Sequence, residues 1–142
     1  MSNSELVKRW FEEIWNRGNV SAIDELLSEQ CSVVGLDSTD VCCRNEMRMF
    51  YDKMTSALEN IKIEIDQIVE SPSDEIAVIF SVTAVHRATQ KPVSCRSAAF
   101  GTVENGQFKS VLNVVDFLTL FIHAGVLPEN AVEKGLMSTR AY

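Results

Sequence analysis

The sequence predicts an α+β domain, in which three helices and a short strand precede four long antiparallel strands and a helix that returns over the sheet. Three observations carry this prediction. Residues 3–17 repeat apolar side chains at helical spacing, whereas from Ile61 the apolar period becomes two. Within residues 93–116, two strand-like runs flank Asn105-Gly106, and Asn-Gly is the strongest short-range signal for a hairpin turn.

Length and charge restrict the class of protein. The 142 residues are 46% hydrophobic, which fits one domain with a continuous core. We expect a core over about residues 5–127 and a C-terminal tail over 128–142. The net charge is −7 and no run of Lys or Arg occurs, so we expect no nucleic-acid partner.

The chain also lacks the signals of a membrane or secreted protein. Charged residues interrupt the apolar residues of the N-terminus, and no stretch approaches the roughly 18 apolar residues of a membrane span. The four cysteines do not form the C-x-x-C pairs of zinc or redox sites. We therefore expect a soluble cytoplasmic protein with free thiols, no membrane partner, and no metal or cofactor.

Two helices are predicted at the N-terminus. Ser2 and Glu5 have the spacing of a capping box at the start of the helix over residues 3–17, and Gly18 ends it. The apolar face of this helix includes Trp10, Phe11 and Ile14. Asn19 is expected to cap the second, short helix.

A short strand over Cys31–Val34 and a polar loop over residues 35–41 precede the third helix. This helix runs from about Arg44 to Leu58 and places Phe50 on its apolar face. Its methionines suit either an adaptable cavity wall or an irregular core.

The remaining elements are mainly strands. The alternation that begins at Ile61 changes step after Gln67, which predicts a bulge there. The next strand covers Ile76–Arg87, and the Asn-Gly hairpin follows. The second hairpin strand leads through Asp116 into an apolar helix closed by Gly125, and this junction is expected to form one wall of a pocket. Pro128 can begin one further helical turn.

This order of elements resembles the nuclear transport factor 2-like superfamily, and within it the SnoaL-like, or polyketide cyclase-like, branch. The residues that carry the resemblance are VKRWFEEIWNRGNVSAIDELL at 7–27, AVHR at 84–87 and ENGQFKSVLNVVDFLTLFIHAGVL at 104–127. The resemblance implies a cone-shaped fold, in which a curved antiparallel sheet is wrapped around the N-terminal helices and encloses an apolar cavity. It implies no single reaction, because isomerases, cyclases, lyases, hydrolases and binding modules share this cone.

The register that the resemblance implies turns alternate strand residues into the cavity. The inward residues on the strands are Phe80, Val82, Ala84, His86, Cys95, Ser97, Ala99, Gly101, Val111, Asn113 and Val115. Together with Trp10, Phe11, Ile14 and Phe50 from the helices, every member of this set except His86 and Gly101 is expected to bind the substrate.

The best-known activities of the superfamily find little support in these residues. The three positions that match the catalytic groups of ketosteroid isomerases are Phe11, Gly35 and Ala98. Those matching the His and Asp of SnoaL-like cyclases are Ala99 and Asn113. Epoxide hydrolase-like sites, which need an Arg between two Asp residues, would fall on Ser97, Ala99 and Asn113.

His86 and Asp116 are the remaining candidates for catalysis. His86 is the one inward residue whose ordinary pKa suits acid-base chemistry at neutral pH, although a partly solvated histidine at a strand end is the simpler interpretation. Asp116 could orient another catalytic group or act as a base, or it could only cap the helix that follows. His123, near the end of that helix, is expected to interact with the helix C-terminus.

The outer face of the predicted sheet would be apolar. It would carry Ile79, Val85, Phe100, Leu112 and Val114. A contiguous apolar patch of this kind is rarely left in water, so we expect a homodimer formed through this face.

Two functions therefore remain open. The first is an isomerase, cyclase or lyase acting on a small hydrophobic substrate, with His86 as acid or base and Asn113 holding a substrate oxygen. The second is a module that binds a small apolar or weakly polar molecule, or serves assembly, without catalysis.

Overall fold

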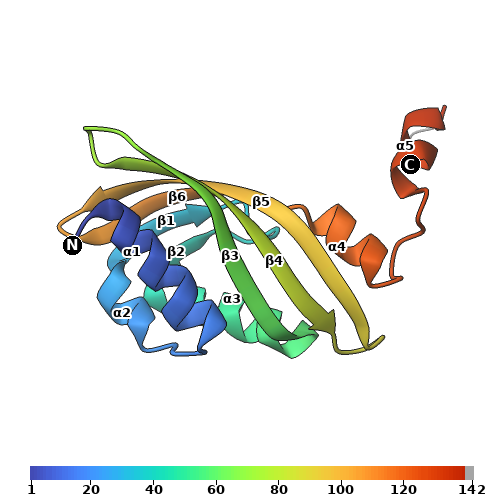
Figure 1. The fold of residues 1–142 in the computed structure, drawn as a ribbon, viewed down its shortest axis with the longest axis horizontal. Helices are drawn as coiled ribbons and strands as arrows, with labels where there is room; N and C mark the ends of the chain where they lie inside the picture. The colour runs from blue at the N-terminus through green and yellow to red at the C-terminus, as the bar shows by residue number, and fades with distance from the viewer. Residues whose placement is uncertain (140–142) are drawn as a thin grey trace.

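The computed structural model describes residues 1–139, in which one six-stranded sheet bends over a layer of helices (Figure 1). The helices are α1 (Asn3–Arg9), the π-helix η1 (Trp10–Asn16), α2 (Ala22–Leu26), α3 (Arg44–Ala57), α4 (Phe117–His123) and α5 (Ala131–Met137). The strands are β1 (Leu27–Val34), β2 (Val41–Cys43), β3 (Leu58–Glu70), β4 (Glu75–His86), β5 (Lys91–Glu104) and β6 (Gln107–Val114). The sheet order is β2-β1-β6-β5-β4-β3, and among these neighbours only β1 and β6 run parallel.

The predicted hairpin is the β5–β6 pair. Asn105 and Gly106 have φ values of 54° and 74°, which is the left-handed conformation that a tight two-residue turn requires. In this register Ala99 lies opposite Asn113, and Gly101 lies opposite Val111. The bulge predicted near Gln67 is also present, because the β3–β4 register shifts between Ile65 and Gln67.

The N-terminal helix begins as predicted and then changes type. Ser2 accepts a hydrogen bond from the Glu5 backbone and the Glu5 carboxylate accepts one from the Ser2 backbone, which completes the capping box. After Arg9 the helix widens into the π-helix η1, and Gly18 ends it with a φ of 73°.

The Asn16 side chain joins the end of η1 to strand β3. Its Nδ2 donates to the carbonyl oxygen of Ile63 at 3.0 Å, and its Oδ1 accepts from the Ile63 backbone N–H at 2.7 Å. Since β3 is an edge strand, the amide takes the place that a further strand would occupy.

Three predictions about the N-terminal half need correction. Helix α2 begins after Ser21 rather than being capped by the Asn19 side chain, and Asn19 contributes its backbone carbonyl to Ala22 N–H instead. Strand β1 begins at Leu27, four residues earlier than expected, and pairs with β6. The predicted loop ends in β2, which pairs with β1 immediately before α3.

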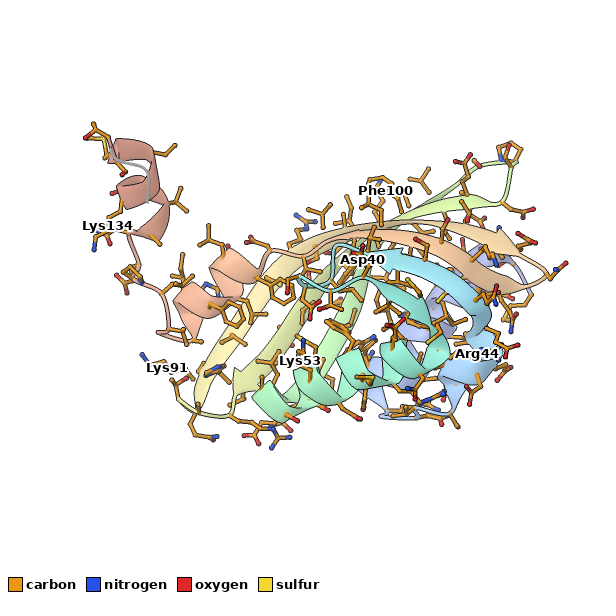
Figure 2. The ribbon with its side chains drawn as sticks, turned by 180° about the vertical axis from the view of Figure 1, so that it is seen from behind. Asp40, Arg44, Lys53, Lys91, Phe100 and Lys134 are labelled. Atoms are coloured by element: carbon orange, nitrogen blue, oxygen red, sulfur yellow. The ribbon has the colours of Figure 1, made fainter. Side chains whose placement is uncertain are left out.

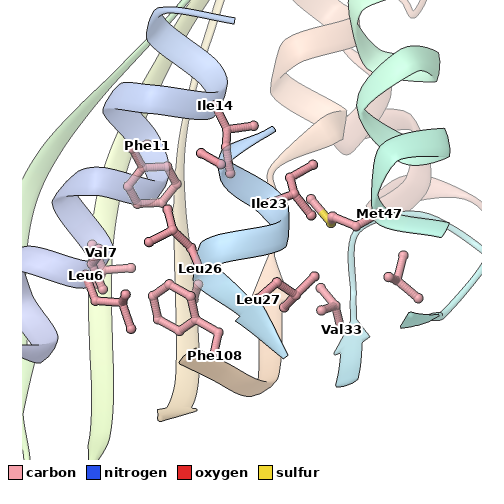
Figure 3. Close-up of a cluster of buried hydrophobic side chains, with 14 of the residues drawn as sticks. Leu6, Val7, Phe11, Ile14, Ile23, Leu26, Leu27, Val33, Met47 and Phe108 are labelled. Atoms are coloured by element: carbon pink, nitrogen blue, oxygen red, sulfur yellow. The ribbon is translucent and has the colours of Figure 1, made fainter. Parts of the chain in front are cut away.

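The main core lies between the helices and the concave face of the sheet (Figure 3). Leu6, Ile14, Ile23, Leu26 and Leu27 are almost completely buried in it. A second, smaller cluster joins α4 to the ends of β4 and β5 through Leu58, Ala84, Val93, Cys95, Leu120 and Ala124. No helix among residues 1–139 is long and apolar enough to cross a membrane.

The convex face of the sheet carries the predicted apolar side chains. Ile79, Phe100, Leu112 and Val114 are exposed, as is Val69, whereas Val85 is half-buried. Figure 2 shows Phe100 on the side of the sheet opposite α3.

Candidate functional site

A cavity opens inside the main core, between the sheet and the helices. Its volume is about 130 Å³. Every helix except α2 and α5, and every strand except β2, contributes side chains to its wall. The lining residues are Val7, Trp10, Phe11, Trp15, Leu27, Val33, Leu36, Met47, Phe50, Met54, Leu58, Ile61, Ile63, Val78, Phe80, Val82, Cys95, Ala99, Gly101, Phe108, Val111, Asn113, Val115, Phe117 and Leu120.

The strand side of the cavity follows the alternation of the sheet. Phe80 and Val82 reach it from β4, and Cys95, Ala99 and Gly101 reach it from β5. The last strand and the residue after it contribute Val111, Asn113 and Val115. Small side chains on β5, next to larger ones on β4 and β6, leave space at the centre of the sheet.

The π-helix forms the opposite wall. Its hydrogen bonds join residues five apart, so Trp10 and Trp15 lie one turn apart on the same side, whereas α-helical geometry would rotate them away from each other. Phe11 packs on Phe80 with ring centroids 4.7 Å apart, and Trp15 packs on Phe50 at 6.2 Å. These aromatic contacts connect the helical wall to the sheet and to α3.

Asn113 is the one amide in the cavity wall among the described residues. Its Nδ2 donates to the carbonyl oxygen of Val34 at 3.1 Å, which fixes the side chain against the end of β1. Gly35 makes this close approach possible: it has a φ of 80°, and a Cβ there would collide with the Asn113 carbonyl oxygen. No residue of the described chain donates a hydrogen bond to Asn113 Oδ1, so this acceptor remains available.

Cys95 is the one titratable thiol in the wall. Burial raises the pKa of Cys95, so the neutral form prevails near neutral pH. Its Sγ lies 3.6 Å from Ser97 Oγ. Ser97 faces inward and is buried, but its Oγ accepts a hydrogen bond from the Asp116 N–H at 3.3 Å and it does not line the cavity.

Asp116 caps helix α4. Its Oδ1 accepts from the Thr119 N–H at 3.0 Å, and its Oδ2 accepts from the Thr119 hydroxyl at 2.6 Å. These hydrogen bonds from Thr119 lower the pKa of Asp116 below the usual value for an aspartate. The carboxylate is exposed and lies outside the cavity wall, although its neighbours Val115 and Phe117 belong to it.

Neither histidine reaches the cavity. His86 ends strand β4, where its Nδ1 lies 3.0 Å from Thr89 Oγ1 in the turn to β5. The expectation that it faces the cavity is therefore not met, and its catalytic role stays a prediction. His123 joins α4 to β5, because its Nδ1 accepts a hydrogen bond from the Ser94 N–H at 3.2 Å.

Two further predicted lining residues pack elsewhere. Ile14 is fully buried in the main core, and Ala84 is buried in the second cluster with Leu58 and Leu120. Both are buried, but neither lines the cavity.

The sequence-based prediction also missed part of the wall. Leu27, Val33 and Leu36 enter it because β1 pairs with β6, a long-range contact that no local pattern shows. Ile61 and Ile63 could have been found, since they belong to the recognised alternation of β3. Phe117 and Leu120 form the wall that was predicted at the junction of β6 and α4.

The wall of the cavity has few polar or ionisable side chains. Among residues 1–139, its members include no carboxylate, histidine, lysine or arginine. No group of three His, Cys, Asp or Glu side chains in this part of the chain could hold a metal ion.

A bent sheet that encloses a cavity against N-terminal helices defines a domain of the nuclear transport factor 2-like, or ketosteroid isomerase-like, class. The sequence pattern of the SnoaL-like domain matches residues 7–111. The chain therefore belongs to the SnoaL-like domain family.

Solved structures share this fold at low sequence identity. IdmH, a candidate polyketide cyclase from Streptomyces antibioticus, has a TM-score of 0.78 and 15% identity over 88% of this chain and 99% of its own. A protein with a ketosteroid isomerase-like fold from Catenulispora acidiphila, in complex with trimethylamine, has a TM-score of 0.79 and 14% identity over 91% of this chain and 98% of its own.

A candidate polyketide cyclase from Bacillus cereus is also similar to this chain, with a TM-score of 0.78 and 18% identity over 88% of this chain and 81% of its own. No curated protein sequence is significantly similar to this chain. At these identities the structural neighbours support the fold, and the family membership rests on the sequence match.

Proposed function

We propose that this SnoaL-like domain binds one small, predominantly apolar molecule in its cavity and does not act on it by acid-base catalysis. The observation that carries the proposal is a cavity of about 130 Å³ whose wall is apolar except for the Asn113 amide and the Cys95 thiol. Apolar walls with a few placed polar groups are typical of small-molecule sites.

The volume limits the size of the ligand. An apolar cavity of about 150 Å³ in another protein stays free of water and binds benzene, so a ligand with one ring and short substituents is the appropriate size. Burying about 150 Å² of apolar ligand surface is worth roughly 4 kcal/mol, which corresponds to a dissociation constant near 1 mM before any hydrogen bond is added.

The polar groups of the wall support binding rather than proton transfer. An amide such as Asn113 accepts and donates hydrogen bonds but does not exchange a proton near neutral pH. The Cys95 thiol is an unfavourable nucleophile, because its raised pKa keeps the reactive thiolate scarce. The positions that the resemblance matches to the catalytic residues of the familiar activities hold Phe11, Gly35, Ser97, Ala98, Ala99 and Asn113.

The test uses two adjacent alanines on β5. Ala99 lines the cavity, whereas Ala98 pairs with Val114 on the outer face. Ala99→Leu is expected to fill the space and to weaken binding of toluene or 4-methylphenol at least tenfold, and Ala98→Leu is expected to leave it within about twofold. The chain has two tryptophans, Trp10 and Trp15, and both line the cavity, so their fluorescence reports the binding.

Two outcomes would contradict the binding proposal. One is equal binding by the two leucine variants. The other is conversion of a bound ligand, which NMR of the ligand recovered after long incubation would detect.

Membership of a family with cyclase-like structural neighbours favours a second candidate, an isomerase, cyclase or lyase acting on a small hydrophobic substrate. In that case Asn113 would hold a substrate oxygen, and His86 or Asp116 would act from the margin of the site. His86→Gln should then lower turnover of a substrate at least a hundredfold. Unchanged turnover would remove His86 from the mechanism.

We also infer that the domain forms a homodimer through the outer sheet face, since Phe100, Leu112 and Val114 are exposed there side by side. Phe100→Asp should convert the dimer to a monomer in sedimentation experiments, and an unchanged dimer would place the interface elsewhere. A cytoplasmic location completes the proposal and is supported by the sequence features alone.

A further inference from the structure

Helix α5 stands apart from the rest of the domain. It follows α4 by a short connection and projects away from the sheet and the other helices (Figure 1). None of its residues is buried, and among residues 1–139 no other element makes more than marginal contact with it. Its large apolar side chains are Val132, Leu136 and Met137, of which Leu136 and Met137 are each 80% exposed.

This helix is too short to be stable alone. It has seven residues, whereas isolated helices need about 12–15 residues to be even marginally stable in water. Gly135 lies within it, and Asn130 at its start makes no side-chain capping bond. Its stability and the burial of its apolar side chains therefore have to come from another surface.

The outer face of the sheet offers such a surface. A shallow hollow of about 330 Å³ lies there beside Phe100. Its residues come from the connected ends of β3 and β4 and from the adjoining part of β5, and they are Val69, Glu70, Ser71, Glu75, Ile76, Ala77, Phe100, Gly101 and Thr102. Figure 2 shows α5, labelled at Lys134, rising toward the same side of the sheet as Phe100.

The helix does not pack on the hollow of its own chain, and only a fully extended connection would bring it near. The connection is anchored to α4 as far as Leu127, whose N–H donates to the Phe121 carbonyl oxygen, and the Ala131 N–H closes a turn on the Pro128 carbonyl oxygen. Three residues span at most about 10 Å, and a seven-residue helix adds about 10 Å.

The hollow lies at the far limit of that reach. Helix α4 is fixed near the beginning of β5, where His123 accepts the Ser94 N–H. The hollow includes Phe100 and Gly101, and the distance along β5 from Ser94 to Gly101 is about 23 Å at about 3.3 Å per residue. Helix and hollow thus lie toward opposite ends of the same strand.

We infer that α5 is an exchanged arm that packs its apolar side chains into the outer-face hollow of a second copy of this chain. The inference rests on the proposed dimer through the outer sheet face. When two sheets pack back to back with their β5 strands antiparallel, the end of β5 near α5 in one copy lies next to the end of β5 near the hollow in the other copy. The twofold symmetry makes both contacts at once, as a closed dimer requires.

The arm also adds apolar area to the sheet face. Five exposed apolar side chains, with exposed fractions of 37–59%, provide roughly 400 Å² of apolar surface. A stable interface buries about 800 Å² per partner, somewhat more than half of it apolar. The sheet face alone comes close to that apolar area, and Val132, Leu136 and Met137 raise it further.

The direct test is photocross-linking in the full-length protein. A photoreactive benzoylphenylalanine replaces Leu136, and ¹⁴N- and ¹⁵N-labelled chains are mixed so that cross-links between chains have a hybrid isotope pattern. We expect hybrid cross-links to peptides that contain residues 69–77 or 100–102. Cross-links within one chain, cross-links to other segments, or none at all overturn the inference.

A matched pair of variants provides a second measurement. Leu136→Asp should raise the dimer dissociation constant at least tenfold in sedimentation equilibrium, without changing the circular dichroism of the protomer, because Leu136 is 80% exposed within its own chain. Met49→Asp is the control, since Met49 is exposed at 61% on α3, and should change the constant less than twofold.

The outcomes separate the two proposals. A dimer that Leu136→Asp leaves unchanged refutes the exchanged arm while the sheet-face dimer stands. A protein that is monomeric at all concentrations refutes both. The cavity proposal is tested by ligand binding to the same samples and depends on neither result.

Discussion

Replacing Asn16 by alanine should destabilise the fold and loosen one wall of the cavity. The amide makes two hydrogen bonds with the Ile63 backbone, at 3.0 and 2.7 Å, in a half-buried setting on the free edge of β3. Each such bond contributes about 0.5–1.5 kcal/mol, and an unpaired, partly buried backbone group costs more than an exposed one. We therefore expect a loss of about 2 kcal/mol.

The assay is thermal and urea unfolding followed by circular dichroism. For a chain of this size, about 2 kcal/mol corresponds to a fall in Tm of roughly 8 °C. Asn3→Ala is the control, because Asn3 makes one exposed hydrogen bond to Asp74, and it should cost no more than about 0.5 kcal/mol. Equal losses in the two variants would refute the view that the Asn16 amide completes the edge of β3.

Three further predictions concern the cavity margin. Gly35→Ala should destabilise the domain by ~3–5 kcal/mol in urea unfolding, because alanine would be forced into a positive φ and its Cβ would collide with the backbone. Gly106→Ala, whose Cβ meets no neighbouring atom, should cost only about 1 kcal/mol. Equal costs in the two variants would count against the close approach of Gly35 to Asn113. Asp116→Asn should remove the part of acid unfolding that Asp116 causes. Hydrogen bonds lower the folded-state pKa of Asp116, so its contribution to stability is present above the ordinary aspartate pKa and is lost as pH falls through the lowered value. The free energies of unfolding of wild type and variant should therefore converge in strong acid, and a constant difference across pH would contradict this. Asn113→Leu should abolish the preference for 4-methylphenol over toluene while both still bind, as measured by tryptophan fluorescence, and a preserved preference would show that Oδ1 does not receive the hydroxyl.

The sequence predicts best those features that neighbouring residues determine. The capping box at Ser2 depends on contacts three residues apart, and the turn at Asn105 depends on two φ values. Gly18 ends the first helix for the same local reason. Such features do not depend on which distant segment packs against them, and the structure has all three.

Features that depend on distant partners were less predictable. The parallel pairing of β1 with β6 joins segments about 80 residues apart, and it brings Val33 into the cavity wall. The π-helix is another case, because the apolar spacing of residues 3–17 predicts an α-helix, whereas the wider turn after Arg9 brings both Trp10 and Trp15 into the cavity wall. Local propensity is a weak guide where packing decides.

For the site, alternation along a strand predicts which face a residue occupies but not how far along the strand the cavity extends. Phe80, Val82 and Asn113 are in the wall, as the inward register implies. His86 has the same parity as Phe80, but it lies at the end of β4, beyond the cavity, where Thr89 is its partner. Alternation along β4 therefore could not show that His86 lies outside the cavity.

The same alternation places cavity residues on one face of β5 and β6 and exposed apolar residues on the other face. Ala99 and Asn113 are cross-strand partners in the cavity wall, and Phe100 and Leu112 are cross-strand partners on the outer face. A slip of one residue between β5 and β6 would exchange the two faces, because side chains alternate with a period of two. The turn at Asn105-Gly106 and the approach of Gly35 to Asn113 both oppose that slip. Lengthening the turn by one residue should therefore impair ligand binding and dimer formation together, whereas Ala99→Leu should impair ligand binding alone. A lengthened turn that affected only ligand binding or only dimer formation would show that the register does not couple the two faces.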